Sequence, residues 1–419
     1  MSIRASRGGK INSRTTVDIV RVIEIDGQDW LFYRGFPLQI AFLRGTTADP
    51  NGNVTAEREA LDLDNLAMAM AVKNSGGVVI VQVERIARAG SLHPRQVIIP
   101  GVLVDCVVVG EPENHRQTNS TDYNPAFSAE ICVPLDGVAA MPLDERKIIA
   151  RRCALELRAG AIVNLGIGMP EGVAAVAAEE LVSDLFTLTA EPGVIGGIPA
   201  SGLDFGAAVN TDAIIHQNQQ FDFYDGGGLD IAVLGMAEVD RVGNVNVSRF
   251  GTRLAGAGGF INISQNARKV VFAGTFTASG LDLRIEDGKL RVAQEGRALK
   301  FGNGVQQVTF SGKVAAEADK VVLFVTERCV FRLTIGGLEL AEVAPGIDIE
   351  RDILGHMAFR PREMDPRIFR PELFNLRGRL LDLDLSERLA FDAERNICFS
   401  ILRDYMSVTR GMSRLFGRP

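Results

Sequence analysis

An internal repeat is the feature that most limits how this chain can fold. Two twelve-residue stretches, Leu43–Val54 and Leu234–Val245, resemble each other. Each follows an apolar run, ends in a Gly-Asn-Val turn, and is followed further along by a second apolar run. Both turns are expected to join strands, because glycine makes a tight reversal with positive φ cheap. Two related domains are the simplest architecture, since two copies are too few for a solenoid.

Strand-like and helix-like segments alternate along most of the chain, which is typical of an α/β fold. Val78–Val83 and Val270–Ala273 are short apolar runs rich in β-branched or aromatic residues, so we predict buried strands there. Three segments have helical composition, namely Ala60–Lys73, Glu145–Leu157 and Glu171–Glu180. The pattern predicts open α/β domains.

The polar stretch 111–130 is the expected boundary between the two domains. We therefore predict a first domain over 1–135, a second over 136–372, and a separate tail over 373–419. The second copy of the repeat is preceded by Ala161–Gly168, and nothing before the first copy matches that segment. The first domain is therefore expected to be incomplete, without a counterpart of the second domain's opening half.

An acidic residue, Glu191, stands at the end of one expected strand. The run 185–190 is short and apolar, and a glycine-rich loop, 192–197, follows at once. Pro192 favours an extended backbone at Glu191, which keeps the carboxylate at the carboxyl end of the strand. Ligands bind at the carboxyl ends of strands in open α/β sheets, so Glu191 is a candidate nucleophile. The alternative is a solvated loop carboxylate, which local sequence alone favours.

Three further glycine clusters could bring backbone N–H groups close to a substrate. Gly166–Gly168 resembles a dinucleotide fingerprint, but the third glycine comes one place late and Pro170 intrudes. Gly226–Gly228 follows Phe221–Asp225, an expected aromatic and acidic strand, and Gly256–Gly259 is the third cluster. Backbone N–H groups aimed at a carbonyl can form an oxyanion hole. Each cluster taken alone is more often a plain turn.

Composition excludes several classes of function. The chain has 419 residues and a net charge of -7, which argues against non-specific binding to nucleic acid or to an anionic membrane. No apolar run reaches the roughly 18 residues expected of a membrane span. The 5 cysteines include no Cys-x-x-Cys pair, and the 4 histidines lack metal-ligand spacing. We therefore expect no metal site, no disulfide framework, and a reducing cytoplasm as the location.

Taken together, these motifs resemble the family I CoA-transferases. The resemblance is strongest to the acetate or propionate CoA-transferase branch, which carries both homologous halves on one chain. It extends from about Gly8 to about Arg370 in a collinear match. The strongest stretches are Asn164–Val173, Ala190–Asn210, Phe221–Gly235, Gly243–Gly251, Gly258–Lys269 and Thr326–Leu333. The resemblance implies two homologous open α/β domains.

The resemblance also implies a set of site residues. The family's catalytic glutamate lies in a Glu-x-Gly element, which here is Glu191-Pro192-Gly193. Glu191 would carry a γ-glutamyl-CoA thioester, with coenzyme A as a substrate and no cofactor or metal. Gly259, in the Gly258-Gly259 pair, would donate an oxyanion N–H. The three glycines Gly226, Gly227 and Gly228 would shape the site beside Glu191.

The expected substrates are short-chain acyl-CoAs (acetyl, propionyl, butyryl or acetoacetyl) and free carboxylates, as in short-chain fatty acid or ketone-body metabolism. Family members begin upstream of Gly8, with a Pro-Gln-Gly element that supplies another oxyanion donor, and the tail from about Phe399 diverges. The alternative is therefore a truncated, catalytically impaired homologue that binds acyl-CoA or acts as a partner subunit. We expect a homo-oligomer or pairing with a separate N-terminal half. A nicotinamide-dependent dehydrogenase, suggested by the turn at Gly166, is the third possibility.

Overall fold

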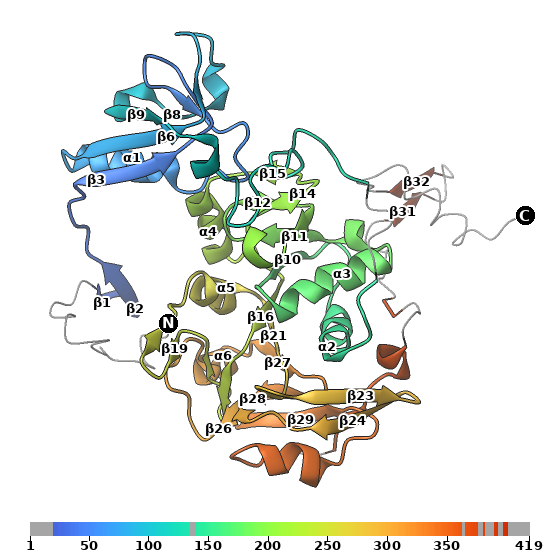
Figure 1. Ribbon diagram of the computed structural model, residues 1–419. Helices are drawn as coiled ribbons and strands as arrows, with labels where there is room; N and C mark the ends of the chain where they lie inside the picture. The colour runs from blue at the N-terminus through green and yellow to red at the C-terminus, as the bar shows by residue number, and fades with distance from the viewer. Residues whose placement is uncertain are drawn as a thin grey trace, which may run out of the picture.

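The computed structural model describes residues 20–134, 140–362, 365–375, 380–381, 389–392 and 397–400. Its centre is a mixed ten-stranded sheet with the order β15-β12-β11-β10-β16-β21-β27-β28-β29-β30 (Figure 1). The strands are β10 (Ile162–Leu165), β11 (Thr187–Ala190), β12 (Val194–Ile195), β15 (Ala213–Ile214), β16 (Ile231–Gly235), β21 (Lys269–Ala273), β27 (Val321–Val325), β28 (Cys329–Thr334), β29 (Gly337–Val343) and β30 (Arg367–Ile368).

The five middle strands, from β11 to β27, run parallel to one another. Helices α2 (Glu145–Ala154) and α3 (Gly172–Glu179) cover one face, while α4 (Gln217–Asp225), α5 (Phe260–Asn266) and α6 (Gly312–Glu317) cover the other (Figure 1). Two apolar cores form as a result, one on each face. Both faces of a parallel sheet must be covered in this way, because its strands are apolar on both sides.

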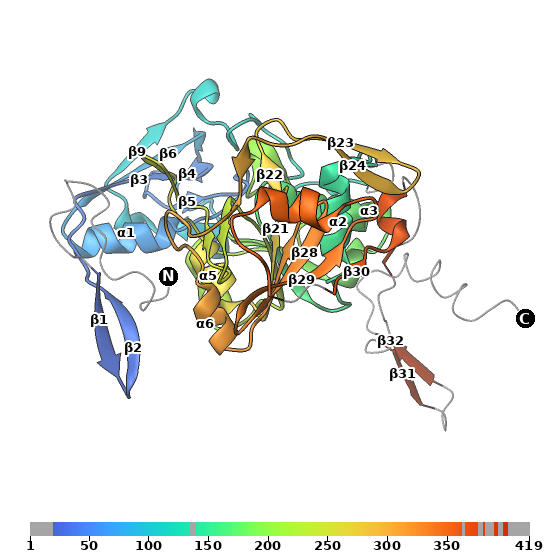
Figure 2. The ribbon, with the colours of Figure 1, turned by 90° about the horizontal axis from the view of Figure 1, so that it is seen from below.

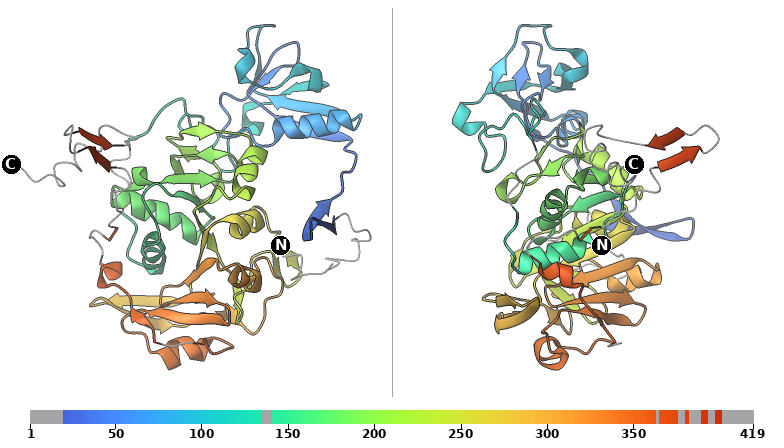
Figure 3. Two further views of the ribbon diagram at one scale, coloured as in Figure 1. Left: turned by 180° about the vertical axis from the view of Figure 1, so that it is seen from behind. Right: turned by 90° about the vertical axis from the view of Figure 1, so that its right-hand side faces the viewer.

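A smaller parallel sheet stands beside the large one, as both views in Figure 3 show. It has the order β3-β6-β9, with β3 at Ile40–Arg44, β6 at Val78–Val83 and β9 at Cys106–Val109. Helix α1 (Asn65–Asn74) packs on one of its faces through Ala69 and Val72. The described residues thus form two α/β units, which agrees with the predicted fold class.

The repeat predicted from the sequence is present in three dimensions. Asp49 accepts hydrogen bonds from the backbone N–H groups of Asn51 and Asn53, both at 3.0 Å. Asp240 accepts the equivalent bonds from Val242 at 3.1 Å and Asn244 at 3.0 Å. In each turn the asparagine side chain also donates to the aspartate.

Each of these turns lies in a small sheet beside its own parallel sheet. The first belongs to the sheet β7-β4-β5-β8 and the second to β18-β17-β26. The strands are β4 (Thr47–Ala48), β5 (Val54–Thr55), β7 (Arg85–Ile86), β8 (Val97–Ile99), β17 (Glu238–Asp240), β18 (Val245–Asn246) and β26 (Phe301–Gly302). The two copies of the repeat therefore share both their local turn and its place beside the sheet.

Six antiparallel ribbons complete the described structure. The first of them, β1–β2, projects away from the body of the molecule (Figure 2). The ribbons are β1 (Val20–Ile25) with β2 (Gln28–Tyr33), β13 (Ile198–Pro199) with β14 (Ala208–Val209), β19 (Arg249–Phe250) with β20 (Arg253–Leu254), β22 (Thr277–Ala278) with β25 (Ala298–Leu299), and β23 (Asp282–Glu286) with β24 (Lys289–Gln294). A sixth pair, β31 (Leu389–Asp392) with β32 (Ile397–Ser400), lies in the predicted tail.

Most predicted elements are found, with two kinds of error. The strand expected over Phe221–Asp225 is wrong, because these residues form the second half of helix α4. Their aromatic rings suggested a strand, but Phe221 and Tyr224 lie one helical turn apart and both turn toward the sheet. Boundaries also differ. Helix α1 begins at Asn65 rather than Ala60, because Leu63 has a φ of 53° that no helix allows.

Replacing Asp240 by alanine should destabilise the fold. The buried carboxylate satisfies two backbone N–H groups and one amide, and hydrogen bonds to a charged acceptor are stronger than neutral ones. We expect a loss of about 2 to 4 kcal/mol in the free energy of unfolding. Urea denaturation would measure it, with Asp282→Ala as the control because Asp282 is an exposed strand residue. Equal stability of the two variants would contradict the role of the turn.

Candidate active site

Glu191 lies where the sequence predicts, directly after strand β11 and at the carboxyl edge of the five parallel strands. The residue is half-buried, with its side chain between β11 and helix α5. Burial raises the pKa of the Glu191 carboxyl above its ordinary value of 4.5. A carboxylate stripped of part of its water in this way is a stronger nucleophile than a solvated one, since water no longer stabilises its charge.

Gly259 is brought against the Glu191 carboxylate, although 68 positions separate the two residues in sequence (259 minus 191). A methyl group on Gly259 would overlap Oε2 of Glu191, and it would lie 2.9 Å from Cδ of Glu191 and 2.8 Å from Cζ of Phe221. Only glycine fits here without displacing the carboxylate. The fold therefore places Gly259 directly against the carboxylate of Glu191.

Two further glycines near Glu191, Gly193 and Gly258, fix the backbone of the loops around it. Gly193 has a φ of 122°, and a side chain there would overlap the carbonyl oxygen of Ile215. Its own carbonyl accepts a hydrogen bond from the N–H of Ile215 at 2.9 Å. Gly258, with a φ of 52°, turns the chain into helix α5 just before Gly259. Gly193 and Gly258 thus shape the two loops that meet at Glu191.

The structure does not bring the glycine cluster Gly226–Gly228 to Glu191. Gly226, Gly227 and Gly228 end helix α4, where the N–H of Gly228 donates to the carbonyl of Phe223 at 3.0 Å. They lead into the start of β16, and the starts of parallel strands lie at the sheet edge opposite to Glu191. Their observed role is to close the helix, because Gly227 takes a φ of 88° that favours glycine.

A buried polar network beneath Glu191 was missed by sequence reasoning. The Tyr224 hydroxyl donates to Oγ1 of Thr189 at 2.8 Å and accepts from Nε2 of Gln220 at 2.8 Å. Nδ2 of Asn164 donates to the same hydroxyl at 3.3 Å. Burial raises the pKa of the Tyr224 phenol, and the nearby charge of Glu191 raises it further. The network ties β10, β11 and α4 together two residues before Glu191, which stabilises the position of the nucleophile.

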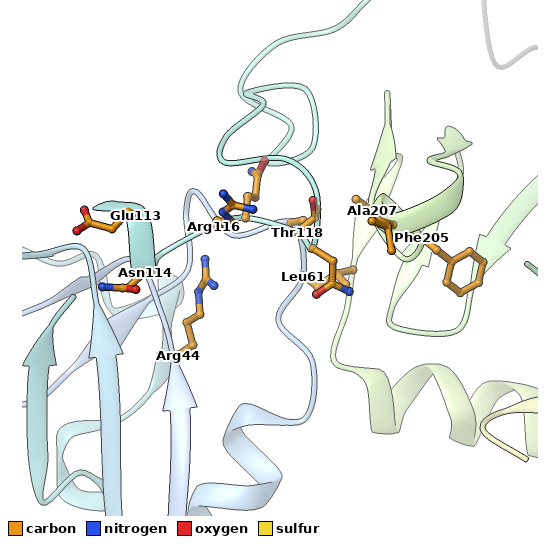
Figure 4. Close-up of a pocket in the computed structure, with 12 residues that line it drawn as sticks. Arg44, Leu61, Glu113, Asn114, Arg116, Thr118, Phe205 and Ala207 are labelled. Carbon is orange, nitrogen blue, oxygen red and sulfur yellow. The ribbon is translucent and has the colours of Figure 1, made fainter. Parts of the chain in front are cut away.

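A cavity of about 410 Å³ lies between the small sheet and the loop that follows Glu191 (Figure 4). Arg44, at the carboxyl end of β3, and Arg116 line one side, and Leu61, Phe205 and Ala207 line the other. Glu59 anchors Arg44 by an ion pair of 3.0 Å and also contacts His115 at 2.9 Å. Guanidinium groups beside amide and apolar walls can hold an anionic or amide-rich ligand.

Leu61 links this cavity to the Glu191 loop. It packs against the small apolar cluster formed by Ala190, Val194 and Ala208, and both Leu61 and Pro192 lie beside Gly206. The carboxyl edges of the two parallel sheets therefore face a common junction.

Among the described residues, no group of three or more His, Cys, Asp or Glu side chains could hold a metal ion. In the same part of the chain, no helix is both long and apolar enough to cross a membrane.

Comparison with known proteins assigns the chain to a class. Residues 8–110 match the coenzyme A transferase family. The caffeate CoA-transferase of Acetobacterium woodii is 50% identical over 374 residues, which is 86% of this chain and 71% of that protein. The acetate CoA-transferase YdiF of Escherichia coli K12 is 44% identical over 369 residues, which is 87% of this chain and 69% of that protein.

A solved structure agrees with the sequence relatives. The acyl-CoA transferase YdiF of Escherichia coli O157:H7, crystallised as the apoenzyme, has a TM-score of 0.83 and 42% identity. The match covers 89% of this chain and 70% of that one. The chain therefore belongs to the coenzyme A transferase family, and within it to family I, as its sequence predicts. These matches favour this family over the dehydrogenase suggested by the turn at Gly166.

Replacing Glu191 by glutamine should stabilise the folded protein at neutral pH. The folded-state pKa of this carboxyl is raised, so its contribution to stability is complete below about 4.5 and is lost as the pH rises through the raised folded pKa. Glutamine is neutral at every pH and removes that loss. We expect Glu191→Gln to melt above the unmodified chain at pH 7, with the difference shrinking toward pH 4.5. Thermal unfolding at the two pH values measures it, and an equal difference at both would contradict the role of burial.

Proposed function

We propose that this chain transfers coenzyme A between a short-chain acyl-CoA and a free carboxylate, with Glu191 as the covalent nucleophile. The observation that carries the proposal is the contact between the half-buried Glu191 carboxylate and Gly259 at the carboxyl edge of the sheet. A carboxylate placed against glycine backbone can be approached closely by a thioester, because no side chain stands in the way. Acetyl-, propionyl-, butyryl- and acetoacetyl-CoA are the proposed donors.

The proposed reaction proceeds by acyl exchange without ATP. The Glu191 carboxylate attacks the thioester carbonyl, and the C–S bond breaks to release CoA thiolate and leave a mixed anhydride. The thiolate then attacks the Glu191 carbonyl of that anhydride, which forms the γ-glutamyl-CoA thioester and frees the first carboxylate. A second carboxylate reverses both steps and leaves as the new acyl-CoA. Each step exchanges one acyl partner for another, so no external base is needed.

Backbone groups complete the proposed site. We assign the oxyanion N–H to Gly259, and we assign substrate contacts to Gly193 and Gly258, which shape the loops beside Glu191. Gly226, Gly227 and Gly228 act in this proposal only indirectly, by ending helix α4. Support for a thioester intermediate comes from a relative, since a YdiF structure with a TM-score of 0.79 and 42% identity is described as a thioester complex with CoA.

Trapping the intermediate tests the proposal. The protein is incubated with acetoacetyl-CoA or propionyl-CoA, treated with borohydride, digested, and analysed by mass spectrometry. A reduced residue or a CoA-sized adduct on the Glu191 peptide is expected, and hydroxylamine should remove the CoA adduct. Finding the adduct on another residue, or none with substrate turning over, would overturn the assignment.

The other proposals follow from the family. We propose that coenzyme A is a substrate and that no metal or other cofactor takes part, in the cytoplasm and in short-chain fatty acid or ketone-body metabolism. We also propose the domain limits 1–135, 136–372 and 373–419. The second candidate function for this chain is that of an acyl-CoA-binding or partner subunit. The observation that favours it is the exposed apolar face of the small sheet, where Phe42 is 77% exposed. Self-association or pairing with a separate N-terminal half would cover such a face.

A further inference from the structure

The internal repeat allows the two parallel sheets to be compared position by position. With Leu43 matched to Leu234, β3 corresponds to β16, and the strand registers then match β6 to β21 and β9 to β27. In each sheet the three strands are parallel and in the same order. Each position on one sheet therefore has a counterpart on the other.

One face is covered in the same way in both sheets. Ala41 and Leu43 are buried under helix α1 in the small sheet. Their counterparts, Ala232 and Leu234, are buried in the core that contains helix α5 of the large sheet. This agreement shows that the residue correspondence is correct on at least one side.

The other face differs sharply between the two sheets. In the large sheet it packs under helices α2 and α3. In the small sheet the same positions carry apolar side chains that are exposed. The pairs are Ile40 at 56% against Ile231 at 0%, Phe42 at 77% against Val233 at 0%, and Val108 at 46% against Val325 at 0%. Exposed contiguous apolar side chains of this kind mark an interaction surface.

The edge of the small sheet differs in the same way. Strand β16 pairs along its outer edge with β10, in parallel. Strand β3 is the edge strand of its sheet within the described residues, so its outer N–H and C=O groups face no strand there. An open edge next to an open apolar face is a ready site for strand addition.

We infer that the open face of the small sheet, formed by Ile40, Phe42, Val78 and Val108, binds a helix–strand–helix unit of the same design as α2–β10–α3. The strand of that unit would pair in parallel with β3, and its helices would cover the four apolar side chains. A flat protein surface or a single helix would cover the face but leave the strand edge unpaired. In the large sheet, helices α2 and α3 cover the corresponding face, and β10 pairs with the corresponding strand edge.

Docking of this unit on the small sheet would also affect the candidate active site. In the large sheet the carboxyl end of β10 opens into the turn Gly166–Gly168, at the same edge as Glu191. By the same correspondence, the docked strand would end beside Arg44 and the cavity between the units. The unit would thus close one side of that cavity. This consequence rests on the proposed function, whereas the binding itself does not.

Co-purification tests the binding. The full chain is co-expressed with a tagged polypeptide made of the part of the Acetobacterium woodii caffeate CoA-transferase that lies outside the match. We expect a stable one-to-one complex. Phe42→Asp should lower recovery of the complex roughly tenfold or more, because a charge would be buried at the centre of the face. Ile335→Asp is the matched control, since Ile335 is 90% exposed in the turn between β28 and β29. Ile40→Lys provides a second variant.

The reactivity of Cys106 measures directly whether the open face is covered. It is exposed on β9, opposite Ile80 in register and at the position that corresponds to Leu323 of the large sheet. Alkylation of Cys106, read by peptide mass spectrometry, should slow at least tenfold in the complex, while the exposed Cys132 serves as the internal reference.

Two results would overturn the inference. One is a chain that purifies alone as a dimer and becomes monomeric in Phe42→Asp, because a second copy would then cover the face. The other is a failure to co-purify, with Cys106 as reactive in the mixture as in the chain alone. A complex that forms but transfers no CoA would instead contradict the proposed function and leave the interface intact.

Discussion

Replacing Glu191 by alanine is expected to lower kcat for CoA transfer from propionyl-CoA to acetate by at least about 1,000-fold, because removing a covalent nucleophile removes the reaction path itself. The fold should survive, since the carboxylate is half-buried and burial already raises its pKa. Binding of CoA should change little, so the loss should appear in kcat rather than in the dissociation constant. A coupled assay of acetyl-CoA formation and calorimetric CoA titration separate the two quantities.

Two variants sharpen this test. Glu191→Asp keeps the carboxylate but shortens the side chain by one methylene, so a partial loss is expected from the misplaced attack. Glu286→Ala, on the exposed ribbon β23–β24, removes a carboxylate away from the site and should leave the rate unchanged. If Glu191→Ala and Glu286→Ala were equally active, Glu191 could not be the nucleophile.

The second large effect is expected at Gly259. A methyl group there would overlap Oε2 of Glu191 and lie 2.8 Å from the ring of Phe221, so Gly259→Ala must displace the carboxylate or the helix start. Displacing a reacting group by about 1 Å costs roughly 100-fold in rate. We therefore expect kcat to fall about 100-fold. Far-ultraviolet circular dichroism should be unchanged, and the initial rate at saturating acyl-CoA measures the fall.

A matched control exists on the same edge of the sheet. Gly235, at the end of β16, has open space where a methyl group would stand. Gly235→Ala should therefore be as active as the unmodified chain. If Gly259→Ala kept full activity as well, the contact with Glu191 would not position the nucleophile.

Much of the fold could be predicted because its signals are local. The strand Val78–Val83 is observed with the predicted bounds, and the Gly-Asn turns of the repeat are observed with equivalent hydrogen bonds around Asp49 and Asp240. Turn chemistry and apolar runs depend on neighbours in sequence, so a single chain reveals them. The sequence predicts a strand over Phe221–Asp225 where the structure has helix α4, because aromatic residues favour both when the partner surface is unknown.

The residues of the site also differ in whether the local sequence reveals them. Glu191 could be selected from its place after an apolar run and before Pro192, which is local information. The network of Tyr224, Thr189 and Asn164 could not, because these side chains come from three elements and meet only when β10, β11 and α4 pack. The spacing of Phe221 and Tyr224, one helical turn apart, is the sequence signal that points to Tyr224 facing the sheet.

By itself the sequence determined the α/β class, the duplicated turn and the carboxylate at a strand end, because each depends on residues close together along the chain. Only the tertiary structure decided that Gly259 meets Glu191, that Gly226 to Gly228 lie at the opposite edge, and that Phe42 is exposed where Val233 is buried. These outcomes depend on strand order and on what packs over each face, and both arise from contacts between residues far apart in sequence.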